Sequence, residues 1–129
     1  MFWLVLVARV LVGIPFLVFG LNHFAHFLPT PAMTLPENAA KFAGALSASG
    51  YMNVVKVLEV TGRALVLSGR LVPFGLVLIT PVAVNIALWD LFLVGSPALG
   101  VVLTALCAFL IWAYRSHFAP LFAVKPRIG

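Results

Sequence analysis

Three charged side chains, Lys56, Glu59 and Arg63, stand in the segment KVLEVTGR, which is flanked by almost entirely apolar sequence. Their spacing of three and four residues places them on one face of a helix. Because an ionised side chain in contact with lipid costs several kcal/mol, we expect this face to point away from lipid. Two interpretations stay open: a network of ion pairs that holds helices together, or a site that binds a ligand or transfers a proton.

Arg9, in the first apolar run of the chain, is expected to join this group. With a helix rise of about 1.5 Å per residue, Arg9 and Arg63 both lie roughly 9 Å inside the same edge of a membrane. Arg63 also stands four residues after Glu59 in its own helix. We therefore expect two arginines to bracket Glu59 from adjacent helices.

A second polar group is predicted at the opposite ends of the helices, where it would rim a cavity; its members are Asn22, His23, His26, Lys56, Asn85 and Asp90. His23 and His26 could share a metal or a haem edge, or bind a loop or lipid head groups by hydrogen bonds. Two histidines without further ligands do not justify predicting a metal centre. Asn85 suits either the cavity or a hydrogen bond between helices. Asp90 suits either the cavity or a membrane interface beside Trp89.

The composition indicates which elements position these residues. Of the 129 residues, 64% are hydrophobic and only 9% are charged, against about 25% charged in soluble domains. Such a chain is expected to be an integral membrane protein that contacts the lipid bilayer. A span needs about 20 residues, and four apolar runs fit, at about residues 3–23, 51–69, 71–93 and 99–114. We predict one all-α transmembrane domain, residues 1–129, built as a four-helix bundle.

The segment between the first two spans is predicted to hold a short helix that lies at the membrane interface. Thr34 and Glu37 have the spacing of a capping box. Apolar residues follow at helical spacing: Leu35, Ala39, Phe42 and Leu46. The segment is too short and too polar to span a membrane. Gly50 is expected to end the helix.

The basic residues predict the orientation. In a four-span chain both termini and the turn after span two share one side, which would carry Arg70, Arg115, Lys125 and Arg127. The other side has Lys41, which Glu37 offsets, and the turn after Asp90. The positive-inside rule therefore places both termini in the cytoplasm. The net charge of +5 is scattered rather than gathered in a patch, so nucleic-acid binding is not expected.

Catalytic motifs are missing from the sequence. It contains no GxGxxG, P-loop, HExxH or GxSxG pattern, so no residue can be assigned a catalytic role. The single cysteine, Cys107, can form neither an intrachain disulfide nor a CxxC pair. We interpret it as a small buried residue. Whether the chain is an enzyme stays open.

Several segments, in their order and spacing, carry a resemblance to a known family. They are Arg9 followed by VGIPFLVFGLNHF, the SGY before span two, KVLEVTGRALVLSGR, and PFGLVLITPVAVNIALWDLFL. The layout resembles the DoxX-like family of small four-helix membrane proteins over about residues 4–93. The resemblance implies a multi-pass protein of the bacterial inner membrane with a quinone-linked role.

The resemblance also bears on single residues. Gly20 with His23, and Glu59 with Gly62, match patterns common in the family. Many relatives carry histidine where this chain has Asp90, which argues against a histidine-dependent cofactor site at that position.

Two classes of function fit these observations. In the first, the chain is a redox-associated subunit: a quinone head group accepts hydrogen bonds from Arg9, Arg63 or Lys56 and exchanges protons with Glu59 or His23. Since the sequence shows no electron carrier, a bound haem or a soluble oxidoreductase partner would have to supply one. In the second, the chain is a non-enzymatic carrier, a lipid- or metabolite-binding protein, or a scaffold for a partner. A homo-oligomer is expected in either class, because one four-helix bundle encloses little volume.

Overall fold

A computed structural model describes residues 1–26, 35–96 and 98–129, and every regular element in these ranges is helical. The prediction of an all-α protein is confirmed. The elements are α1 (Phe2–Ala25), α2 (Glu37–Ala48), α3 (Tyr51–Ser68), α4 (Val72–Leu88), the π-helix η1 (Trp89–Val94), α5 (Ala98–Ala113) and two 3-10 turns, η2 (Arg115–His117) and η3 (Ala119–Phe122).

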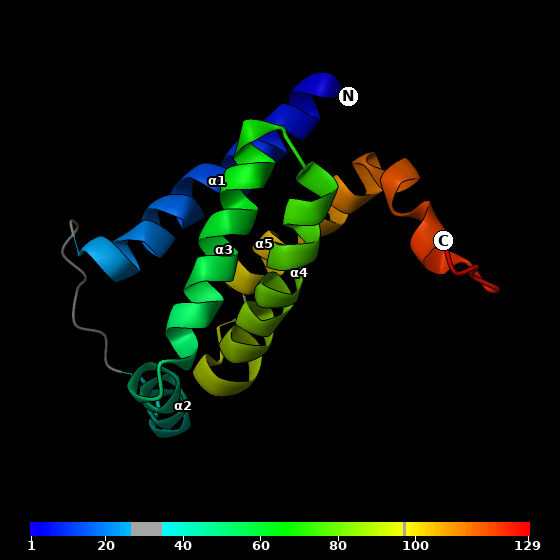
Figure 1. Cartoon of the computed structure of the whole chain (residues 1–129). Coiled ribbons are helices and arrows are strands. Elements are labelled where there is room, and N and C mark those ends of the chain that lie inside the picture. Colours follow the sequence, from blue (N-terminus) through cyan, green and yellow to red (C-terminus); the bar gives the residue numbers. More distant parts are fainter. Residues whose placement is uncertain (27–34, 97) are drawn as a thin grey trace.

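The four long helices pack side by side, and the short α2 lies across one end of them (Figure 1). Helix α3 packs against α1 on one side and α4 on the other, and α4 packs against α5. A smaller contact between α1 and α5 closes the arrangement. The C-terminal segment leaves the helices near the end where the chain begins (Figure 1).

Several glycines lie where two helices pack closely against each other. A Cβ added to Gly62 of α3 would overlap Ile79 of α4, and one added to Gly75 of α4 would come within 2.8 Å of the Gly62 carbonyl oxygen. A Cβ on Gly100 of α5 would overlap the backbone of Ala87. Small residues of this kind let helix backbones approach closely, as they do between membrane helices.

The predicted spans agree with the helices to within two residues at each end, apart from the last turn of the third. Span three, predicted over residues 71–93, is α4 followed directly by η1. The chain is therefore helical up to Val94, but its last turn has widened to π geometry. Such widened turns occur often at functional sites.

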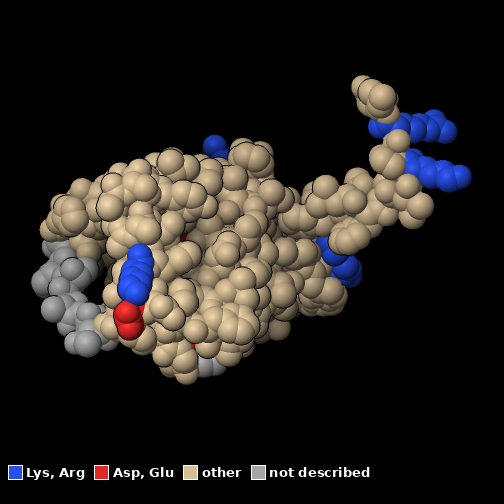
Figure 2. Space-filling view, turned by 90° about the horizontal axis from the view of Figure 1, so that it is seen from below, with Lys and Arg blue, Asp and Glu red and all other residues tan. Residues whose placement is uncertain are grey.

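In the part of the chain that the structure describes, two helical stretches are long and apolar enough to cross a membrane: Phe2–Ala25, with 24 residues, and Val72–Val94, with 23. Helix α5 is apolar but has 16 residues, and α3 carries three charged residues among its 18. Large apolar side chains cover the outside of the bundle, among them Leu4, Leu11, Phe19, Val57, Phe74, Val77 and Val101. Seen from the end that carries α2, most of the surface is neither acidic nor basic (Figure 2).

The short helix predicted before span two is present as α2, but it starts later than expected. It begins at Glu37, directly after Pro36, so the predicted capping box does not form its first turn. Thr34, the other residue of that box, lies outside the described residues. Gly50 adopts φ +81° between α2 and α3, a conformation that glycine reaches without strain.

Candidate functional site

The centre of the site is Glu59, a carboxylate on α3 that is only 3% exposed. Lys56 Nζ lies 3.1 Å from its Oε2, and Arg63 Nη2 lies 2.9 Å from its Oε1. Both cations belong to α3, three residues before and four residues after Glu59. The predicted shared face is therefore confirmed, and both carboxylate oxygens have a charged partner.

Arg63 ties this ion-pair group to α1. Its side chain is 0% exposed, and its Nη1 donates a hydrogen bond of 2.8 Å to the Val12 carbonyl oxygen. The guanidinium carbon also lies 4.5 Å from the centre of the Phe16 ring, which is a cation–π contact. A backbone carbonyl oxygen has two lone pairs, so the Val12 oxygen can accept the bond from Arg63 in addition to a bond within its own helix.

Arg9 does not bracket Glu59 as predicted. Its Nε donates to the Val66 carbonyl oxygen at 2.8 Å and its Nη2 to the Leu67 carbonyl oxygen at 3.1 Å, in the last turn of α3. The last four carbonyls of a helix lack partners within the helix and form its negative end. These carbonyls therefore bind the Arg9 guanidinium, whereas Glu59 already pairs with Lys56 and Arg63. Gly69 makes room, since a Cβ there would lie 2.6 Å from Arg9 Nη2.

The polar residues at the end of α1 form a separate group. His23 Nε2 lies 2.9 Å from Asn53 Oδ1, which joins the end of α1 to the start of α3. His26 ends α1 with φ 50°, and its side chain is exposed. Asn22 is buried. Within the described ranges no three His, Cys, Asp or Glu side chains gather where they could hold a metal.

A cavity of about 870 Å³ lies between α2, α3, α4 and η1. Four of the predicted site residues line it: Lys56, Glu59, Asn85 and Asp90. The other five, Arg9, Asn22, His23, His26 and Arg63, do not. The predicted polar rim is thus divided: its residues on α3, α4 and η1 share the cavity, and its residues at the end of α1 do not.

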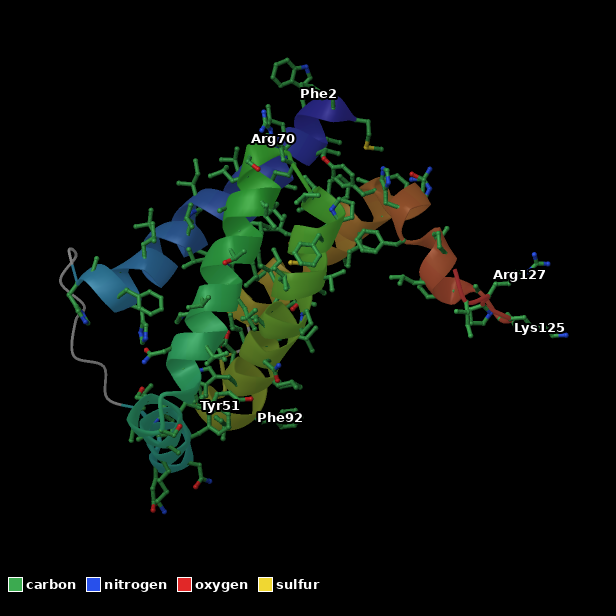
Figure 3. All side chains as sticks on the ribbon, in the orientation of Figure 1. Phe2, Tyr51, Arg70, Phe92, Lys125 and Arg127 are labelled. Atoms are coloured by element: carbon green, nitrogen blue, oxygen red, sulfur yellow. The ribbon has the colours of Figure 1, made fainter. Side chains whose placement is uncertain are left out.

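Apolar and aromatic side chains form the rest of the cavity wall. The short α2 contributes Phe42 and Leu46, and the Phe42 ring lies 5.7 Å from that of Trp89. Tyr51 and Phe92, which also line the cavity, lie at the α2 end of the bundle, opposite Phe2 and Arg70 (Figure 3). Sequence reasoning missed this contribution of α2. The helical spacing of its apolar residues is the available signal, but the same spacing fits a helix that lies on a membrane surface.

Asn85 and Asp90 line the cavity, and each also makes a hydrogen bond to a backbone group that was not predicted. Asn85 Nδ2 donates to the Pro81 carbonyl oxygen in its own helix at 3.0 Å, so this bond does not cross between helices. Asp90 Oδ2 accepts a hydrogen bond of 2.9 Å from the Gly100 N–H in the first turn of α5. Asp90 therefore caps the first turn of α5 through Gly100, ten residues further along the chain.

The arrangement combines an ion-pair group on α3 with an apolar cavity that only part of the group faces. Lys56 and Glu59 line the cavity, while Arg63 pairs with Glu59 but does not line the cavity.

Comparison of the chain with family models, curated proteins and solved structures finds no match. The DoxX-like resemblance therefore stays a prediction from the sequence motifs.

Proposed function

We propose that the chain is a DoxX-like membrane protein with four spans, whose cavity between α2, α3 and α4 binds an amphipathic small molecule. The apolar outer surface of the bundle supports the membrane location, because proteins in water rarely expose large contiguous apolar patches. The four spans are α1, α3, α4 with η1, and α5. Together with the resemblance, this favours a bacterial inner membrane.

The ends of the bundle support the proposed orientation. Phe2 and Arg70 lie at one end, and Tyr51 and Phe92 at the other (Figure 3). Lys125 and Arg127 belong to the C-terminal segment that leaves the bundle near its N-terminus (Figures 1 and 3). The basic residues thus favour the end away from α2, and the positive-inside rule would put that end and both termini in the cytoplasm.

The single observation that carries the binding function is the cavity itself. Its volume of about 870 Å³ falls within the range of roughly 300–1,000 Å³ of ligand sites, and such sites combine mostly apolar walls with a few placed polar groups. Lys56 and Glu59 are the polar groups on the α3 wall. Because Arg63 fixes Glu59, Lys56 is the residue best placed to donate a hydrogen bond to a ligand.

A quinone is the ligand that the resemblance favours, and its carbonyl oxygen could accept this bond. The ion pairs assign Glu59 the role of an anchor, because both of its oxygens are engaged. Electron transfer would be supplied by a soluble oxidoreductase that docks on the membrane protein. The chain would then act as a quinone-binding subunit and not as the catalytic one.

Quenching of Trp89 fluorescence tests this function, because Trp89 lines the cavity. The full chain, with Trp3 and Trp112 replaced by phenylalanine, is placed in lipid nanodiscs and titrated with a quinone that carries a ten-carbon tail. We expect saturable quenching that Ala43→Phe, which fills the cavity, abolishes. Ala108→Phe, outside the cavity, is the control. Quenching that never saturates and is equal in all variants would refute the proposal.

A further inference from the structure

We infer that the cavity prefers a head group with a single negative charge, so that its ligand class is a monoanionic amphiphile such as a fatty acid. The inference rests on the proposed amphiphile-binding cavity, but it favours an anionic head group over the neutral head group of a quinone. It follows from how the charges on the cavity wall are compensated.

The ion-pair group carries a net positive charge, since two cations share one carboxylate. Arg63 forms an ion pair with Glu59 Oε1, and its side chain is completely buried, so it remains the counter-ion of this carboxylate. Lys56 holds Oε2 at the longer distance of 3.1 Å, and its side chain is 25% exposed. An ammonium group has three N–H donors. The positive charge that Glu59 does not neutralise therefore lies on Lys56, at the cavity wall.

The second carboxylate of the wall does not cancel this charge. Asp90 accepts a hydrogen bond from the Gly100 N–H, at the N-terminal end of α5. The positive end of a helix dipole compensates a carboxylate there. Asp90 is not within ion-pair distance of Lys56 among the described residues. On α2, Lys41 and Glu37 pair with each other at 2.8 Å and leave no net charge.

In a bilayer the head group decides which amphiphile binds. The tail of a ligand finds the same apolar surroundings among lipid tails as against Phe42, Trp89 and Leu93 of the cavity, so tail burial discriminates little. A neutral acceptor and an anionic one both accept a hydrogen bond from the ammonium, but the anionic head group is also attracted by its charge. We expect this attraction to raise the affinity roughly tenfold.

The test compares head groups on one tail. The full chain, with Trp89 as its single tryptophan, is placed in phosphatidylcholine nanodiscs. Bromine-labelled twelve-carbon chains that end in a sulfonate, a hydroxyl or a trimethylammonium group serve as quenchers. We expect the sulfonate to bind about tenfold more tightly than the alcohol, and the trimethylammonium compound to bind most weakly.

Variants of Lys56 assign the preference to this residue. Lys56→Gln should reduce the preference for sulfonate to within about twofold of the alcohol, while Lys56→Arg should retain it. Lys41→Gln, on the exposed pair of α2, is the matched control and should change nothing. Equal binding of all three head groups, or a sulfonate preference that survives in Lys56→Gln, would overturn the inference and leave the binding function standing. Absence of saturable quenching by every compound would overturn both.

Discussion

Replacing Glu59 by leucine is expected to destabilise the bundle by about 3–5 kcal/mol, the typical cost of removing one partner from a buried ion pair. Arg63 has 0% exposure and keeps its bond to the Val12 carbonyl oxygen and its contact with the Phe16 ring in this variant, but it loses its carboxylate partner. Its charge would then be buried without a counter-ion. Glu59→Gln should cost less, about 1–2 kcal/mol, because its amide oxygen still accepts a hydrogen bond from Arg63.

The double variant Glu59→Leu with Arg63→Leu separates this cause from a general loss of packing. It removes both buried charges, and apolar replacements of buried pairs are often neutral. We therefore expect it to be more stable than the single Glu59→Leu variant by at least about 2 kcal/mol. Lys56, which is 25% exposed, can turn towards the cavity when it loses its partner.

Glu37→Leu is the matched control, because it breaks an ion pair with the same i,i+4 spacing. Glu37 and Lys41 approach to 2.8 Å, closer than Glu59 and Arg63, yet their side chains are 80% and 70% exposed. Exposed pairs contribute about 0–1 kcal/mol. Burial and not distance should therefore decide which substitution matters.

The assay is unfolding of the full chain in mixed micelles by increasing amounts of sodium dodecyl sulfate, followed by far-ultraviolet circular dichroism. The reasoning fails if Glu59→Leu stays within about 1 kcal/mol of the parent chain. It fails equally if the double variant is as unstable as the single one, since the cost would then not come from an unpaired buried charge.

Three further substitutions test other contacts with the same assay. Gly62→Ala should destabilise the bundle by about 1–3 kcal/mol, because its Cβ would overlap Ile79, whereas Gly44→Ala meets nothing within 4 Å and should be neutral or slightly stabilising. Arg9→Met should cost about 1–3 kcal/mol and speed amide hydrogen exchange in the last turn of α3, whose carbonyls it leaves unpaired; equal exchange in both chains would contradict the capping role. Asp90→Ala should cost about 0.5–2 kcal/mol and fray the first turn of α5, and Asp90→Asn should restore most of this loss.

Relations within one helix could be predicted from the sequence. The four long helices follow from runs of apolar residues, and the ion pairs of Glu59 follow from the 3.6-residue period of α3 alone. No knowledge of the neighbouring helices was needed for either. The same holds for α2, whose apolar spacing indicated a helix although its first residue was misplaced.

Relations between helices could not be predicted in the same way. The expected depth in a membrane put Arg9 at the level of Arg63, but Arg9 bonds the carbonyl oxygens at the end of α3 instead of Glu59. Asp90, in η1, accepts its hydrogen bond from the backbone of α5, beyond the turn that follows η1. Such choices depend on which unpaired backbone groups the packing brings close, and a residue pattern does not encode them.

The charged face of α3 also has a consequence for how the protein enters a membrane. In the proposed topology, the three charged residues oppose insertion by the order of 8–10 kcal/mol, while the five valines and three leucines of α3 favour it by only about 2–5 kcal/mol. Helix α3 would therefore not partition into lipid as an independent segment. We expect α3 to insert only when it packs against α1, whose Val12 carbonyl and Phe16 ring contact Arg63. Biogenesis would then be cooperative, with α1 acting as an intramolecular insertion partner for α3.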